Sequence, residues 1–139
     1  PGIYIDAKPI RQWHDAPALV QQLLDKGAMR SVVVLNFGTN AGFQDPASEV
    51  ALRDILAKLG PQRRVVLVNT VGVSKWVPNA NATLQLISSQ FPNTIVADWY
   101  TKAHEKPGLL HTDQTHPNVE GIKVYAEVIA EAMAKLGPG

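Results

Sequence analysis

A carboxylate and an imidazole stand three residues apart in the stretch "LLHTDQTHPNVEG", residues 109–121. At this spacing Asp113 can turn back and accept the Nδ1 proton of His116, which leaves Nε2 free to act as a base. That pair would supply the acid and the base of a Ser-His-Asp acyl-transfer site. The same residues also fit a simpler alternative, in which Asp113 turns the chain and His116 is a surface residue near a helix start.

These two residues must be positioned by a fold, and the chain alternates segments typical of strands and helices. Short runs rich in β-branched residues predict strands at 3–6, 31–38, 64–70 and 94–100. Apolar residues at helical spacing predict helices at 15–27, 45–60, 81–91 and 116–137. This order predicts one domain over residues 1–139, an α/β fold with a parallel sheet in a three-layer α/β/α sandwich of flavodoxin-like type.

Local signals refine the helices. Asp15 and Asp45 are expected to cap the first two helices, and Pro46 suits a first helical position. A loop rich in Gly, Pro and Asn is expected to run through Trp76 and Pro78, and an irregular segment to follow residue 100. The last helix is expected to bury a stripe formed by Ile122, Tyr125, Ile129, Met133 and Leu136.

Polar residues follow the strands at one edge of the predicted sheet. The stretch "NFGTN" ends the strand at 31–38 and "VNT" ends the strand at 64–70, while the Asp113/His116 loop precedes the last helix. Open α/β sheets bind ligands beyond the carboxyl ends of their strands, so these three stretches are expected to meet there. Asn40 offers an amide donor suited to a developing oxyanion, although "GTN" alone is also ordinary turn chemistry.

Composition excludes several other functions. Thirteen Lys and Arg against twelve Asp and Glu give a net charge of +1, which offers no case for nucleic acid. Cysteine is absent, and no apolar stretch is long enough to cross a bilayer. His104, His111 and His116 invite a metal site, but no acidic residue stands at helical ligand spacing, so no metal is expected. No Gly-rich phosphate loop suggests a nucleotide, and no cofactor is predicted.

Taken in order, "VVVLNFGTNAGF", "VVLVNT", "VADWY" and "DQTHPNVEGIKVYAEVI" resemble the SGNH (GDSL-like) superfamily of serine esterases and acyltransferases. They resemble in particular the extracytoplasmic catalytic domains of bacterial O-acetyltransferases that modify peptidoglycan or polysaccharide. The resemblance implies that Asn40 donates to the oxyanion and that Asp113 and His116 are the acid and base of the triad.

The stretch "DAKPIRQW", residues 6–13, is similar to the family's second block. Pro9 lacks an N–H, so the resemblance assigns a second oxyanion donor to the backbone N–H of Ile10. Trp76 is expected to wall an acyl or sugar pocket, or else simply to anchor its loop.

The nucleophile that the family requires is missing from this chain. It is the Ser of a G-D-S block at the end of the first strand, and neither G-D-S nor G-x-S-x-G occurs here. Among the serines that are present, only Ser74 is expected at the correct edge of the sheet. We therefore expect that the strand with the nucleophile lies outside these 139 residues, as an N-terminal or complementing segment, because the remaining strands would otherwise have unpaired backbone groups.

The resemblance implies O-acetyl transfer to, or ester hydrolysis on, cell-envelope carbohydrate. It also implies an extracytoplasmic location and a possible partner in an N-terminal membrane acyltransferase domain. Two alternatives stay open at this point. One is a carbohydrate-binding module that keeps the cleft and lacks catalysis. The other is a flavodoxin-like non-enzymatic domain in which the D-x-x-H spacing is accidental and Asp113 and His116 lie far from Asn40.

Overall fold

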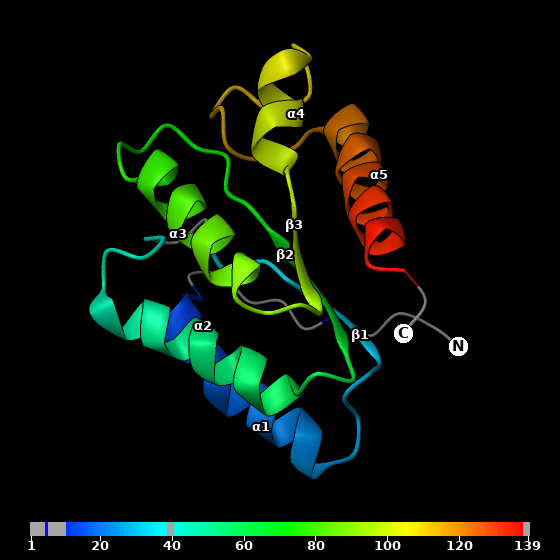
Figure 1. Cartoon of the computed structure of the whole chain (residues 1–139). Helices are drawn as coiled ribbons and strands as arrows, with labels where there is room; N and C mark the ends of the chain where they lie inside the picture. The colour runs from blue at the N-terminus through cyan, green and yellow to red at the C-terminus, as the bar shows by residue number, and fades with distance from the viewer. Residues whose placement is uncertain (1–4, 6–10, 39–40, 138–139) are drawn as a thin grey trace.

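Three parallel strands form the sheet of this computed structural model, which describes residues 5, 11–38 and 41–137. The strands are β1 (Val32–Leu35), β2 (Arg64–Val68) and β3 (Thr94–Ala97), in the order β1-β2-β3. Val34 is paired with Val66, and Val66 with Ile95. Figure 1 shows the three strands side by side with helices around them. The predicted α/β fold with a parallel sheet is confirmed.

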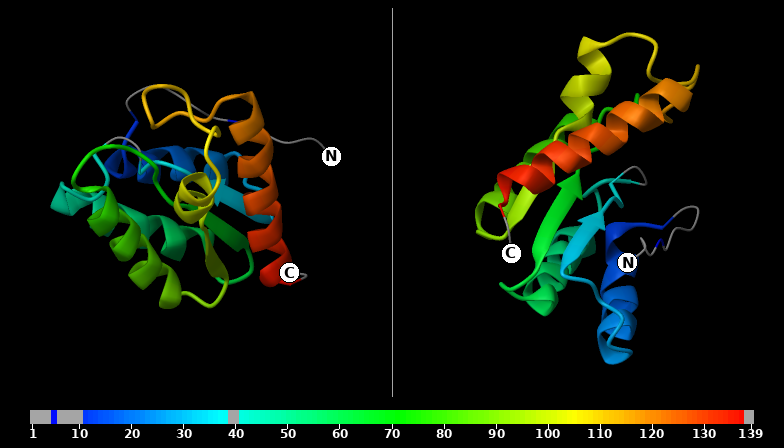
Figure 2. Two further views of the ribbon diagram at one scale, coloured as in Figure 1. Left: turned by 90° about the horizontal axis from the view of Figure 1, so that it is seen from above. Right: turned by 90° about the vertical axis from the view of Figure 1, so that its right-hand side faces the viewer.

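Helices cover both faces of the sheet. One core cluster joins the 3-10 helix η1 (Trp13–Asp15), α1 (Ala16–Asp25), α2 (Pro46–Leu59) and α3 (Val77–Ser89) to one face of β1 and β2. A second cluster joins α4 (Trp99–Glu105) and α5 (Val119–Lys135) to the other face. Figure 2 shows α5 on one side of the sheet and α1 and α2 on the other. These are the three predicted layers.

Two predicted helix starts need correction. The helix expected at 81–91 begins at Val77, because Pro78 occupies its first turn, where a missing N–H costs nothing. Asp15 precedes α1 but does not cap it; its Oδ2 accepts from the backbone N–H of Gln12 at 2.7 Å instead. Asp45 does cap α2, with the Ala47 N–H 2.9 Å from its Oδ1, as predicted.

The strand expected at 94–100 is too long. It ends at Ala97, and the first part of the segment expected to be irregular forms α4, whereas its later part, with Pro107 and Gly108, is irregular as predicted. Asp98 ends the strand because its side chain accepts from the backbone N–H and the hydroxyl of Thr101, which starts a helix. Trp99 is therefore buried as a residue of α4 and not as a strand residue.

Two further expectations differ from the structure or fall outside it. Ile122 was expected in the buried stripe of α5 but is 58% exposed, because Val124, Val128 and Ala132 form the buried face. The strand expected at 3–6 lies outside the described residues except for Ile5. Among the described residues, none lies in a helix long and apolar enough to span a bilayer.

Candidate active site

The carboxylate of Asp113 holds the imidazole of His116. Its Oδ2 lies 2.6 Å from Nδ1 of His116, and its Oδ1 accepts the backbone N–H groups of Thr115 and His116, each at 3.0 Å. A carboxylate that accepts at Nδ1 places the ring proton there, so Nε2 presents its lone pair. The predicted contact between acid and base is present, in the geometry that general-base catalysis needs.

Hydrogen bonding stabilises the charged form of Asp113. The bond from the His116 side chain is the largest cause, and backbone N–H groups of His116 and Thr115 add to it, so the pKa of Asp113 lies well below its usual range. The carboxylate is consequently ionised at neutral pH. An ionised partner favours the imidazolium that forms when His116 takes a proton.

The turn that carries both residues is fixed at its two ends. The backbone N–H of His111 donates to the carbonyl of His116 at 2.8 Å, and that of Asn118 donates to Leu109 at 2.9 Å. Asn118 also caps α5 through a 2.9 Å bond from the N–H of Gly121. Gln114 sits in the left-handed region with φ of 55°, a conformation unusual for a side chain-bearing residue. These hydrogen bonds hold Asp113 and His116, the candidate dyad, in place just before α5.

The three predicted stretches approach one another at the carboxyl edge of the sheet. A Cβ on Gly38 would overlap Oγ1 of Thr70, so the ends of the β1 and β2 segments are in close contact. A Cβ on Gly72 would lie 3.7 Å from Oγ1 of Thr115, next to the dyad. The segment after β2 therefore lies between Gly38 and the Asp113/His116 turn.

Side-chain amides fix the ends of β2 and β3 at this edge. Asn69 donates to Oδ1 of Asp98 at 2.8 Å and accepts from the backbone N–H of Tyr100 at 2.8 Å. Asn81, on α3, bonds both backbone groups of Thr70. Burial raises the pKa of Asp98, but the hydrogen bonds from Asn69 and Thr101 outweigh it and leave the pKa lowered. Sequence reasoning missed Asp98 and Asn81; the D-x-x-T spacing of a helix cap was the available signal for Asp98.

The predicted oxyanion donors, Asn40 and Ile10, both lie outside the described residues. Among the described residues on either side, the N–H of Gly42 donates to the carbonyl of Gly38 at 3.1 Å. Ala41 has φ of 66°, a second left-handed residue beside the candidate site. Strained backbone of this kind is frequent at functional sites. The roles of Asn40 and Ile10 stay predictions.

Trp76 lies against Gly42. A Cβ on Gly42 would be 2.7 Å from Cε3 of Trp76, so the indole packs directly on the backbone of Gly42. The ring is half-buried, just before α3 begins, and not in the middle of a loop. Its position next to Gly42 fits a wall of the site, while its packing also fits the simpler role of a loop anchor.

The described serines offer no obvious nucleophile. Ser48 and Ser88 are buried in helices, Ser89 donates to the carbonyl of Leu86, and Ser31 directly precedes β1 at the opposite edge. Ser74 is exposed in the loop after β2. None of these residues stands at the end of a strand that leads directly into a helix, which is the usual place for an activated serine.

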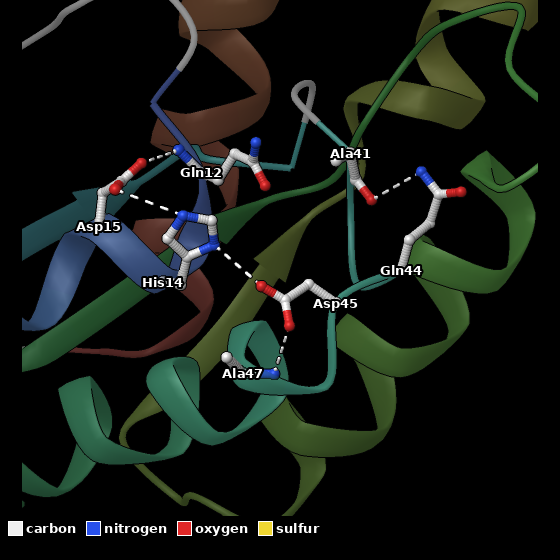
Figure 3. Close-up of polar contacts among 7 residues, drawn as sticks. All are labelled: Gln12, His14, Asp15, Ala41, Gln44, Asp45 and Ala47. Carbon is white, nitrogen blue, oxygen red and sulfur yellow. Dashed lines mark hydrogen bonds and ion pairs between the residues drawn. The ribbon is translucent and has the colours of Figure 1, made fainter.

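Two of the other histidines, His14 and His104, have separate partners. Nδ1 of His104 lies 2.7 Å from the carbonyl of Tyr100, within α4, and His14, in the 3-10 helix, lies close to the carboxylates of Asp15 and Asp45 (Figure 3). Across the described residues, no group of three or more His, Asp or Glu side chains has the arrangement of a metal site.

No protein-family model matches this sequence. The chain is 28% identical over 135 residues to the peptidoglycan O-acetyltransferase OatA of Listeria monocytogenes. That match includes 97% of this chain but only 21% of the relative, so the chain spans about a fifth of the curated protein it matches.

Two solved structures share the fold. One is the C-terminal catalytic domain of Streptococcus pneumoniae OatA with a methylsulfonyl adduct, with a TM-score of 0.83 and 23% identity; the match covers 98% of this chain and 82% of that domain. The other is TesA, with a TM-score of 0.70 and 16% identity over 91% of this chain and 74% of TesA. The chain thus shares the predicted α/β fold with these two proteins, and over nearly its whole length it is similar in sequence to about a fifth of a peptidoglycan O-acetyltransferase.

Proposed function

We propose that this chain is the larger part of a serine O-acyltransferase or esterase domain that acts on acetyl groups of cell-envelope carbohydrate. The observation that carries the proposal is the 2.6 Å contact between Asp113 and His116 at the carboxyl edge of the sheet. The similarity to OatA supports the acetyl group and the carbohydrate, and it supports an extracytoplasmic location in a protein with a membrane domain.

In the proposed reaction, Nε2 of His116 takes the proton of a serine hydroxyl as the serine oxygen attacks the ester carbonyl carbon. The carbonyl oxygen becomes an oxyanion, which Asn40 and the backbone N–H of Ile10 stabilise. His116 then returns the proton to the departing alcohol, and an acyl-serine remains. Water or a sugar hydroxyl attacks this acyl group in the second half, by the same proton transfers in reverse order.

The serine comes, in this proposal, from a further strand beside β1. Among the described residues β1 pairs only with β2, and Val34 is 43% exposed although its register partner Val66 is fully buried. Parallel sheets are normally covered on both faces, so this exposure indicates a missing neighbour. Val33 and Leu35 pack on the α1 and α2 side, which leaves Val34 pointing to the face that α5 covers.

The start of α5 borders the same open surface. Asn36, just beyond β1, donates to the hydroxyl of Tyr125 at 2.6 Å, so this side of α5 faces the end of β1. Ile122, one turn before Tyr125, is 58% exposed, and the side chain of His116 is 69% exposed. A strand along the free edge of β1 would cover Val34 and Ile122 and end near His116.

Hydrolysis of p-nitrophenyl acetate by the full-length gene product tests the proposal. We expect ester hydrolysis that falls by at least about 10³-fold in His116→Ala, because a triad without its base retains only binding and oxyanion stabilisation. Folded protein without such hydrolysis, or with hydrolysis that His116→Ala leaves intact, would favour a carbohydrate-binding module instead.

A further inference from the structure

Thr115 is the half-buried residue in a turn whose other members are exposed. Asp113, Gln114 and His116 on either side of it all lie at the surface. The side chain of Asp113 is 48% exposed, so packing does little to fix the direction of its carboxylate. Within the described part of the chain, the hydrogen bonds of the turn therefore decide where that carboxylate points.

Thr115 bonds to Asp113 at two atoms. Its backbone N–H donates to Oδ1 at 3.0 Å, and its hydroxyl donates to the backbone carbonyl of Asp113 at 3.2 Å. The first bond leaves Oδ2 free to lie 2.6 Å from Nδ1 of His116. The second bond spans Gln114, whose φ of 55° is a conformation that residues with side chains rarely adopt. The hydroxyl thus stabilises a strained turn on which the direction of Asp113 depends.

The side chain of Thr115 also approaches the segment that follows β2. A Cβ built on Gly72 would lie 3.7 Å from Oγ1 and 3.9 Å from Cγ2 of Thr115. The same Cβ would lie 3.6 Å from Cγ2 of Val77, which is buried at the start of α3. Thr115 is therefore the residue through which the exposed turn of Asp113 and His116 meets this part of the domain.

We infer that Thr115 is a positioning residue of the proposed acid–base pair, whose hydroxyl keeps the Asp113 carboxylate directed at Nδ1 of His116. This inference rests on the proposed function. Thr115 acts through Asp113 and is not itself a catalytic residue. The charge of Asp113 stabilises the imidazolium, which exists only while His116 holds the transferred proton. A misdirected carboxylate therefore lowers kcat and leaves ground-state binding of the ester nearly unchanged.

Two substitutions in the full-length gene product separate the two parts of the Thr115 side chain. Thr115→Val has nearly the same shape and removes only the hydroxyl that donates to Asp113. Thr115→Ser keeps the hydroxyl and removes the methyl group that approaches Gly72. The matched control is Thr112→Val, because Thr112 is exposed in the same stretch and its side chain makes no hydrogen bond among the described residues.

We expect kcat for p-nitrophenyl acetate to fall on the order of 10-fold in Thr115→Val, with KM changed less than about twofold. Formation and hydrolysis of the acyl-serine both need His116, so both steps slow together and KM stays nearly constant. Thr115→Ser should keep kcat within about threefold of the original, since the bond to the Asp113 carbonyl remains. Thr112→Val should leave kcat unchanged.

A cycle with Asp113→Asn shows whether Thr115 acts through the charge of Asp113. If it does, Thr115→Val costs on the order of 10-fold in the original protein and less than about twofold when Asp113 is already Asn. A purely structural role of Thr115 would instead lower kcat by the same factor in both proteins.

Four results would overturn the inference: an unchanged kcat in Thr115→Val, a rise in KM alone, a Thr115→Ser variant as slow as Thr115→Val, or an equal loss in the Asp113→Asn protein. An equal loss in Thr112→Val would overturn it as well. Each is measured in protein whose hydrolysis depends on His116, so it leaves the proposed function standing. Lack of hydrolysis that depends on His116 in the unaltered protein would instead overturn the proposed function.

Discussion

Asp113 and His116 are joined twice: Oδ2 of Asp113 lies 2.6 Å from the His116 ring nitrogen, and Oδ1 lies 3.0 Å from the His116 backbone nitrogen. The carboxylate of Asp113 therefore sets the tautomer of the His116 imidazole and also positions the His116 backbone. The turn between them depends on the left-handed conformation of Gln114, so the pair is a built local structure and not an accident of spacing.

Removing the negative charge of Asp113 should affect catalysis far more than folding. Asp113→Asn can still accept the two backbone N–H groups, so we expect an unfolding free energy within about 1 kcal/mol of the original. The amide does not stabilise an imidazolium and favours the wrong tautomer, so kcat should fall roughly 10³- to 10⁴-fold. Steady-state kinetics measures the change in kcat, and urea unfolding measures the change in unfolding free energy. An equal loss of both activity and stability would contradict a catalytic role.

The ends of the β1 and β2 segments lie so close that a methyl group added to one should clash with the other. A second substitution should relieve this clash. Gly38→Ala would drive a methyl group into Oγ1 of Thr70, and overpacking of this kind typically costs about 1–3 kcal/mol of unfolding free energy. Thr70→Ala removes that oxygen, while the remaining Cβ of Thr70 lies at an acceptable 3.6 Å from the new methyl group. The double variant should therefore be more stable than Gly38→Ala alone. Purely additive losses in urea unfolding would show that the two strand ends do not meet as described.

The packing of Trp76 on Gly42 predicts an effect on substrate binding. Gly42→Ala places a methyl group 2.7 Å from the indole and must displace it, so we expect KM for an acetylated sugar to rise severalfold. Gly27→Ala is the matched control, because Gly27 also has a positive φ, of 66°, but has no atom within 4 Å of the new methyl group. Both variants share a backbone strain of about 1–2 kcal/mol. Equal KM values in the two would leave Trp76 as a loop anchor.

Stability in acid should depend on Asp98. Its folded-state pKa is lowered, so its interactions stabilise the protein above pH of about 4 and this contribution is lost as pH falls through the folded-state pKa. We expect Asp98→Ala to lower the unfolding free energy by about 1–2 kcal/mol at pH 7, as loss of a helix cap does, and by less at pH 3. Urea unfolding at both pH values measures the difference. A constant difference would mean that the charge of Asp98 does not matter.

Sequence patterns predicted the elements that have regular periodicity and clear end signals. The runs around Val33 and Val66 are strands because their apolar residues are covered on both faces of the sheet, and Asp45 with Pro46 marks the start of α2 unambiguously. The pattern "VADWY" misled, because Trp99 and Tyr100 are common in strands, while one side-chain cap at Asp98 decides for a helix. At this position the side-chain cap from Asp98 outweighed the strand propensity of Trp99 and Tyr100.

The candidate site was only partly accessible to the same reasoning. The contact between Asp113 and His116 could be predicted because it forms within four residues. The placement of Trp76 over Gly42 and the bridge from His14 to Asp45 could not, since both depend on how α3 and η1 pack on a distant loop. Contacts between segments far apart in sequence leave no periodic signal.

Covalent labelling of the nucleophile tests the central claim most directly. The full-length gene product is treated with methanesulfonyl fluoride, digested and analysed by mass spectrometry, with His116→Ala and Ser74→Ala in parallel. We predict one sulfonylated serine, outside these 139 residues, whose labelling is lost in His116→Ala and retained in Ser74→Ala. Labelling of Ser74, or labelling that proceeds equally without His116, would contradict the account.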